Sequence, residues 1–324
     1  MKKLLIVCAL LLLGACAKAP AAKPVPDPTA TPAPTATAVP TPTATAVPTP
    51  TATPAPTPFS LVVLPDTQEL VYFRPEEIVA LRDWISSHRE ADNLVGVIHT
   101  GDLVDNGFKQ WQWDNFYPLL EVFDEDLFFF PVAGNHDVSQ EKVNFSGYLK
   151  QSFLSAIPEE QRYMGGKCLY RLLPVGEQEL LMLGMGWHTW YDRDACAWAK
   201  GVMDAHPGTP CLLVVHGFLV SETKVYSQVE TFIAQNPSIR LVLCGHKRDY
   251  YTRTFTYDDD GNGTMDRTVT AMMLNMQTKD YAFRVLTIDP LTHGIEVQTL
   301  LLDGSPAPDF PKLGPISFTL EKAF

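Results

Sequence analysis

Short apolar runs recur along the chain, and five of them end at a polar residue that can bind a metal ion. Such runs, rich in β-branched and aromatic residues and separated by helical segments, are typical of buried strands in an α/β sheet. In such sheets ligand sites form beyond the carboxyl ends of the strands, so we expect the five polar side chains to converge at one edge. The runs and the residues after them are 61–65 with Asp66, 94–101 with Asp102, 127–134 with Asn135, 211–215 with His216, and 241–245 with His246.

Helical periodicity fills the spaces between these runs. After Pro75, apolar residues recur at helical spacing, and Pro-Glu-Glu suits the first turn of a helix. We expect further helices near 108–123, 142–155, 193–205 and 224–235, and strands near 168–173 and 178–185. From Tyr250 onward the pattern becomes strand-like, over 250–257, 266–276, 281–288 and 294–301. The alternation predicts a layered α/β sandwich, with mixed sheets in the middle and helices outside.

The N-terminal part of the chain does not follow this pattern. Residues 1–15 combine a basic start with an apolar stretch, and Leu13-Gly14-Ala15-Cys16 resembles the processing box of bacterial lipoproteins. The resemblance implies a signal peptide over 1–15 and lipid on Cys16, with plain secretion as the alternative. The apolar stretch is too short to span a bilayer.

Residues 16–58 are almost entirely Pro, Thr and Ala, a composition that cannot bury a core and predicts a disordered linker. The remaining residues, 59–324, are enough for one large domain. We therefore expect a domain held by lipid at the extracytoplasmic face of a cell membrane.

The net charge of the chain indicates which binding partners to expect. The chain has 25 Lys and Arg against 37 Asp and Glu, and without Lys2 and Lys3 its formal net charge falls from −12 to −14. Such an acidic surface argues against nucleic acid as a partner, but small phosphorylated substrates stay compatible because bound cations can invert the local field. Cys211 and Cys244 lie in apolar runs and are expected to be buried thiols, whereas a bridge between Cys168 and Cys196 stays open.

Several motifs taken in order resemble the calcineurin-like metallophosphoesterases. They are Asp66, Gly101-Asp102-Leu103-Val104-Asp105, Gly134-Asn135-His136-Asp137, His216 and Gly245-His246. The resemblance extends over roughly residues 59–303, and it implies a four-layer αββα sandwich with two divalent metal ions. Asp66-Thr67-Gln68 looks like the branch of this superfamily in which glutamine stands where histidine is usual.

The resemblance also implies roles for single residues. Asp102 would bridge both metals, and His136 would contact the phosphate and protonate the leaving oxygen, with Asp137 orienting it. A metal-activated hydroxide would attack phosphorus. One metal would take its remaining protein ligands from Asn135, His216 and His246.

The ligands expected for the other metal depart from the common pattern. They include Asp66, Asp102 and position 68, which is Gln68, and Arg248 stands where a second histidine is usual. Three interpretations stay open: a weaker site on Asp66, Gln68 and Asp102, a mononuclear centre, or Arg248 replacing a metal's charge at the phosphate. With oxygen and imidazole ligands, one or two Mn, Fe or Zn ions per chain are expected.

The predicted function is metal-dependent hydrolysis of a small phosphorylated substrate, by a phosphodiesterase or phosphatase, with diesters slightly preferred. The alternative is a non-catalytic or mononuclear binding lipoprotein on a degenerate phosphoesterase scaffold, which the changes at Gln68 and Arg248 motivate.

Three further segments have two interpretations each. Residues 258–263 read Asp-Asp-Asp-Gly-Asn-Gly, which fits a hairpin turn or the opening of a weak Ca²⁺ loop. Residues 187–191, rich in aromatics, are expected near the catalytic edge, as packing at the rim or as a stacking surface for substrate. Trp111 and Trp113 are two apart and cannot share a helix face, so one of them can be exposed and shape the cleft.

Overall fold

The computed structural model describes residues 56–138, 157–277, 280–309 and 314–324. The predicted signal peptide, Cys16, nearly all of the linker and the helix predicted near 142–155 lie outside these residues. Among the described helices, none is long and apolar enough to cross a membrane.

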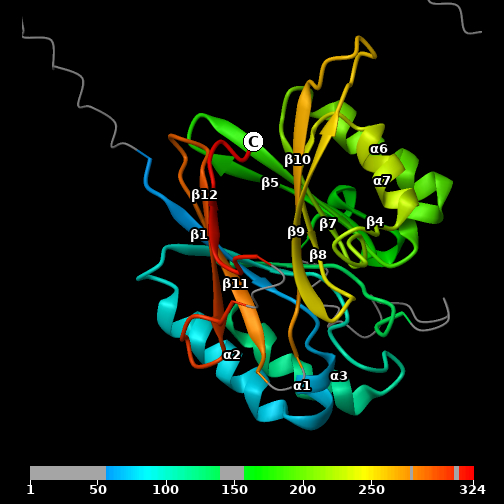
Figure 1. The fold of residues 1–324 in the computed structure, drawn as a ribbon. Coiled ribbons are helices and arrows are strands. Elements are labelled where there is room, and N and C mark those ends of the chain that lie inside the picture. The colour runs from blue at the N-terminus through cyan, green and yellow to red at the C-terminus, as the bar shows by residue number, and fades with distance from the viewer. Residues whose placement is uncertain (1–55, 139–156, 278–279, 310–313) are drawn as a thin grey trace, which may run out of the picture. The chain divides into compact units, whose positions relative to one another are not determined.

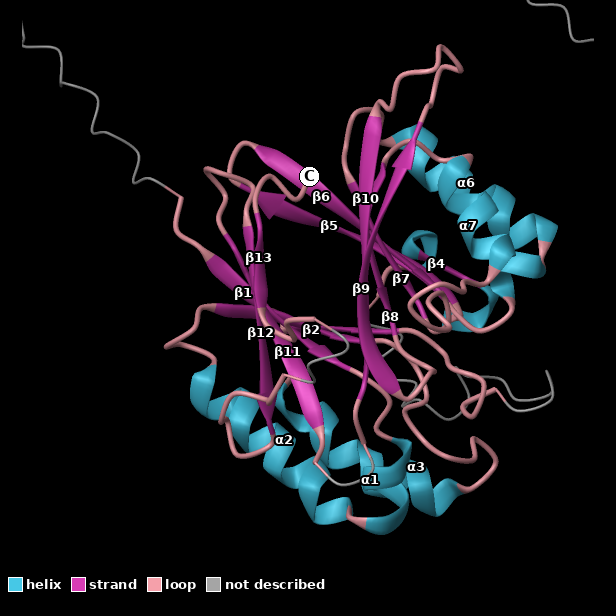
Figure 2. Cartoon of the chain, viewed as in Figure 1, coloured by secondary structure: helices cyan, strands magenta, loops and turns pink. Residues whose placement is uncertain are grey.

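Two mixed β-sheets form the centre of the domain (Figures 1 and 2). Within the described residues the first has six strands, in the order β13 (Phe318–Leu320), β12 (Ile295–Leu301), β11 (Ala282–Ile288), β1 (Phe59–Leu64), β2 (Leu94–His99) and β3 (Phe128–Pro131). The second has seven, in the order β4 (Arg162–Tyr163), β5 (Cys168–Val175), β6 (Gln178–Met185), β7 (Cys211–Val215), β8 (Ile239–Cys244), β10 (Arg267–Asn275) and β9 (Asp249–Tyr257).

Each sheet has a parallel core that ends in candidate site residues. In the first sheet β1, β2 and β3 run parallel, and in the second β6, β7, β8 and β10 do. Antiparallel strands extend both sheets, and β11 pairs with β1 so that Arg284 lies opposite Val63. The parallel strands direct their carboxyl ends to a common edge, which is the arrangement that the sequence pattern predicts.

The helices cover the two outer faces (Figure 2). They are α1 (Gln68–Phe73), α2 (Pro75–His88), α3 (Gln110–Phe116), α6 (Arg193–Ala205) and α7 (Ser227–Ala234), with 3₁₀ turns η1 (Tyr117–Val122), η3 (Glu159–Gln161), η4 (Met164–Gly166) and η5 (Thr189–Tyr191). The predicted helix over 108–123 divides into α3 and η1 because Pro118 has no N–H to continue the α-helical hydrogen bonds.

Alternation along the strands builds the layers. In β1, Val62 and Leu64 pack with α1, α2 and α3, while Leu61 and Val63 pack between the sheets against strands of the second sheet. A third apolar cluster joins the second sheet to α6 and α7. Buried apolar groups therefore fill all three layer boundaries, and the four-layer αββα sandwich expected from the sequence is confirmed.

The remaining local predictions have clear outcomes. Cys211 and Cys244 are buried as expected, and all four described cysteines are free thiols. Residues 258–266 connect β9 to β10, which pair antiparallel, so the hairpin prediction is confirmed. In this turn Asp258 accepts hydrogen bonds from the N–H groups of Gly261, Asn262 and Gly263.

Candidate metal centre

The predicted ligands meet where the strands of both sheets end. Asp66 follows β1, Asp102 follows β2, His216 follows β7 and His246 follows β8. Asp102, His216 and His246 each offer one ligand atom, and these atoms lie within 4.8 Å of one another. Two sheets that share no strand thus supply one cluster of candidate metal ligands.

His216 lies at the centre of this cluster and is fully buried. Its Nδ1 donates to the carbonyl of Thr100 at 2.9 Å, which leaves Nε2 directed at the other predicted ligands. Nε2 lies 3.1 Å from Oδ2 of Asp102 and 3.1 Å from Oδ1 of Asn135. A backbone carbonyl that fixes the imidazole in this way is the usual support of a metal-ligating histidine.

Asp66 and Gln68 supply two buried oxygens that have no hydrogen-bond partner, Oδ1 of Asp66 and Oε1 of Gln68. The other oxygen of Asp66 accepts the N–H of His246 at 3.1 Å. Buried polar oxygens without partners are costly, and a cation is the partner that a carboxylate and an amide oxygen fit. The residues present therefore fit divalent metal ions.

Close backbone packing brings these side chains together. A Cβ on Gly245 would lie 2.3 Å from Oδ2 of Asp66, so only glycine allows this approach. Asp102 and His246 themselves have left-handed backbone conformations, with φ of 55° and 72°. Non-glycine residues held in this region are strained and cluster at functional sites, as they do here.

The electrostatics of the cluster also favour a cation. Burial raises the pKa of Asp66 to about 7, although His216 acts to lower it, and burial raises the pKa of Asp137 to about 7 as well. Burial acts to lower the pKa of His216, but Asp102 and Asp66 together raise it to about 9. The protein thus gathers buried carboxyl groups around one imidazole, and added positive charge would stabilise them in their ionised form.

His136 is oriented differently from our prediction. Its Nδ1 donates to the carbonyl of Asp105 at 2.7 Å and lies 3.4 Å from an oxygen of the Asp105 carboxylate. Asp137, which we expected to orient it, instead accepts the N–H groups of Val104 at 3.0 Å and Gly134 at 2.8 Å. Asp137 is fully buried, so its carboxyl group holds together the two loops that carry Asp102 and Asn135.

Arg248 lies beside this cluster, half exposed, and forms an ion pair with Glu69. Both residues line a cleft of about 380 Å³. The cleft also contains five of the residues described above and two aromatic rings: Gln68, Asp102, Asp105, His136 and His246, with Tyr72 and Phe73. The guanidinium group therefore faces the same space as the predicted ligands and His136.

Sequence reasoning missed His99, which supports the ligands from behind, whereas it placed Trp187 near the catalytic edge, where the structure has it. Buried His99 accepts the N–H of Gly101 at 3.2 Å and pairs with the Thr67 hydroxyl at 3.0 Å, and burial lowers the pKa of His99 to about 3. Trp187 packs on His246, with ring centroids 4.7 Å apart, and meets His216 edge-on at 5.6 Å. The sequence signal for His99 was its position, since it is a polar residue at the end of the apolar run 94–99.

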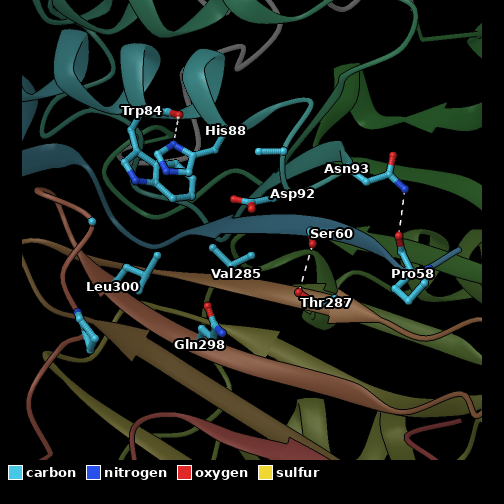
Figure 3. Close-up of a pocket in the computed structure, with 13 residues that line it drawn as sticks. Pro58, Ser60, Trp84, His88, Asp92, Asn93, Val285, Thr287, Gln298 and Leu300 are labelled. Atoms are coloured by element: carbon cyan, nitrogen blue, oxygen red, sulfur yellow. Dashed lines mark hydrogen bonds between the residues drawn. The ribbon is translucent and has the colours of Figure 1, made fainter.

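A larger hollow lies elsewhere and contains none of these residues (Figure 3). It measures about 560 Å³ and is bounded by Trp84 and His88 of α2 and by strand residues that include Thr287 and Gln298. The Trp84 and His88 rings stack 4.1 Å apart, and Ser60 pairs with Thr287 at 3.1 Å. The candidate chemistry thus belongs to the smaller cleft.

Comparison with known proteins agrees with the geometry. The model of the calcineurin-like phosphoesterase family matches residues 59–248, and the chain belongs to this family. Members of this family are phosphoesterases that use divalent metal ions.

Two proteins are similar to this chain, one in sequence and one in fold. The uncharacterized protein YvnB of Bacillus subtilis (strain 168) is 28% identical over 231 residues, which cover 68% of this chain and 18% of that protein. Purple acid phosphatase PPD1 from yellow lupin (Lupinus luteus) seeds has the same fold, with a TM-score of 0.53 and 13% identity over 82% of this chain and 54% of that chain. This chain thus spans about a fifth of YvnB and about half of the lupin phosphatase.

Proposed function

We propose that the chain is a two-metal phosphodiesterase in which Gln68 serves as a ligand where the family usually has histidine. The observation that carries the proposal is the pair of buried oxygens on Asp66 and Gln68 that have no hydrogen-bond partner. Both belong to the metal site that the sequence marks as altered. An altered site that had lost its ion would be expected to lose such oxygens or to pair them with protein donors.

The ligands divide into two sets that share Asp102. Asn135, His216 and His246 complete one set, and Asp66 and Gln68 complete the other. Oxygen and imidazole ligands suit Mn, Fe or Zn. When bound, the cations polarise the phosphoryl group and lower the pKa of a water molecule, which makes it a nucleophile at neutral pH.

His136 is the residue that we propose to protonate the leaving oxygen. Its Nδ1 donates to the Asp105 carbonyl, so a proton given to the substrate would come from the other ring nitrogen, Nε2. The ring is partly exposed and lines the cleft, as proton transfer to a bound ester requires. Asp105 thereby becomes the positioning residue for His136.

Arg248 would contact a phosphoryl oxygen, since a guanidinium binds phosphate through two parallel hydrogen bonds. Its ion pair with Glu69 and the nearby carboxylates of Asp102 and Asp105 limit the positive charge that the cleft offers. A phosphodiester carries one negative charge and a monoester carries up to two near neutral pH. The charge balance therefore favours a diester.

Hydrolysis of bis(4-nitrophenyl) phosphate and 4-nitrophenyl phosphate by the Mn-loaded chain tests the proposal. We expect turnover of both esters, with the higher kcat/KM for the diester. His136→Ala should reduce kcat by at least about 100-fold, as expected for loss of a general acid. No metal-dependent turnover of either ester would refute the proposed activity, and a preference for the monoester would refute the diester assignment.

We also propose that the enzyme is anchored by lipid on Cys16 at the extracytoplasmic face of a bacterial membrane. The processing-box resemblance and the Pro/Thr/Ala-rich linker support this proposal. Labelling with a radioactive fatty acid in a bacterial host should mark the wild-type chain and leave Cys16→Ser unlabelled. Equal labelling of both would overturn the assignment.

A further inference from the structure

Two aromatic side chains lie exposed in the catalytic cleft. Tyr72 is 44% exposed and Phe73 is 69% exposed, and both line the space that contains Asp102, His136 and Arg248. Tyr72, Phe73 and Trp111 are all exposed and adjoin one another, and a contiguous apolar patch, unlike a single exposed side chain, marks a binding surface.

Helix α1 connects these rings to the predicted metal site. The helix begins at Gln68 and ends at Phe73, so Glu69 and Phe73 are one turn apart and lie on the same face. Four residues of helix rise amount to about 6 Å along the axis. A group covalently attached to a phosphate near Gln68 would therefore lie beside the rings.

The rings are held in place by the neighbouring helix. Tyr72 meets Trp111 of α3 edge-on, with ring centroids 5.4 Å apart, and contacts Phe73 at 4.5 Å. The side-chain amide of Asn115 in α3 donates to the carbonyl of Val71 at 3.0 Å, which fixes the end of α1. The rings thus form a supported surface, since two helices hold it in position.

The composition of the cleft indicates the kind of group that fits this surface. Aromatic faces form one side, and the other lining residues are polar or charged, among them Glu69, Asp105 and Arg248. An acyl chain would need apolar walls all round. A nucleobase has a flat π-face to stack and polar edges that can hydrogen-bond, and both features match.

We propose that Tyr72 and Phe73 form a subsite that stacks the nucleobase of a nucleotide phosphoester, with Trp111 positioning Tyr72. This proposal rests on the proposed function, because the phosphate of the same substrate would lie at the metal centre. It makes the substrate a nucleotide rather than a phosphosugar or a phospholipid fragment.

Calorimetric binding of two phosphonates to the full-length, Mn-loaded chain tests the subsite. One is the 5′-methylenephosphonate of thymidine, and the other is the same phosphonate of deoxyribose without a base. Neither contains a phosphoester bond, so binding is measured without turnover, and failure of the subsite is distinguishable from failure of the proposed activity. Base stacking should make the thymidine compound bind about 10-fold more tightly or better.

The ratio of the two dissociation constants decides whether the rings stack a nucleobase. Phe73→Ala and Tyr72→Ala should each bring the ratio close to one. Tyr72→Phe keeps the aromatic ring, so this variant should retain most of the preference for the thymidine compound. Phe108→Ala is the matched control, because Phe108 is 46% exposed nearby but does not line the cleft. Equal binding of the two phosphonates to the wild-type chain, or a ratio that Phe73→Ala leaves unchanged, would overturn the proposal.

Discussion

The Nε2 atom of His216 lies 3.1 Å from the carboxylate of Asp102, although the two residues follow strands of different sheets of the sandwich. The contact joins the carboxyl ends of β2 and β7, and both side chains are buried. A buried carboxylate and imidazole at this distance, beside further carboxyl groups, form a site whose ionised state a cation stabilises.

Removing the shared carboxylate should abolish activity. Asp102→Asn keeps the size of the side chain but removes the charge that both ligand sets use, so we expect kcat to fall by more than about 100-fold. Elemental analysis of the same sample should show reduced metal content. Asp126→Asn, at an exposed carboxylate away from the cleft, is the control and should keep both the turnover and the metal content of the wild type. An Asp102→Asn variant with wild-type metal content and turnover would contradict the ligand assignment.

The two departures from the family pattern can be reversed together. Arg248 cannot bind a cation because it stays protonated, and Gln68 offers only a neutral oxygen. The double variant Gln68→His, Arg248→His should therefore bind its second metal ion at least about 10-fold more tightly. Titration of the chelated protein with Mn²⁺ gives the two dissociation constants. If the weaker constant does not improve, the altered positions do not belong to a metal site.

Buried His99 should make stability depend on pH. Its folded pKa of about 3 is below the ordinary value of 6.5, so the unfolded chain binds a proton that the folded chain does not. The contribution is complete above pH 6.5 and is lost as the pH falls toward 3, by at most about 1.4 kcal/mol per pH unit.

The His99→Gln variant isolates this contribution. Glutamine keeps a donor and an acceptor but does not titrate. The free energy of unfolding of the variant should therefore fall less steeply than that of the wild type between pH 6 and pH 4. Urea unfolding of chelator-treated protein measures the two slopes without metal loss. Identical slopes would show that His99 is protonated in the folded protein.

An ion pair outside the cleft, between a buried arginine and a partly exposed aspartate, should matter for stability. Arg267 is 3% exposed, pairs with Asp259 at 2.8 Å, and donates to the carbonyls of Ile233 and Ile239. Arg267→Met leaves Asp259 without its partner and should cost about 2–3 kcal/mol in the free energy of unfolding. Removing the exposed pair by Arg193→Ala should have no measurable effect. Similar losses in the two variants would contradict this account.

The strands and the meeting of the ligands could be predicted from the sequence because both follow from short apolar runs. The run 211–215 became β7 with the same bounds, and His216 follows it directly. The carboxyl ends of parallel strands then bring distant residues to one edge without any further information.

Other features depend on tertiary contacts that local patterns do not encode. The orientation of His136 comes from a carbonyl in another loop, so the adjacent Asp137 was the wrong partner to expect. Helix α1 has only six residues, too few for a visible period, and its exposed aromatic face went unpredicted. Trp113 is buried and Trp111 is exposed, a choice that the spacing alone leaves open.

The metal content of the purified chain decides whether Gln68 is a metal ligand. After loading with Mn²⁺ and removal of free ions, elemental analysis should find about two metal ions per chain, and Gln68→Ala should reduce this to about one. One ion or none in the wild-type chain would contradict the assignment of Gln68 as a ligand, and with it the two-metal phosphodiesterase.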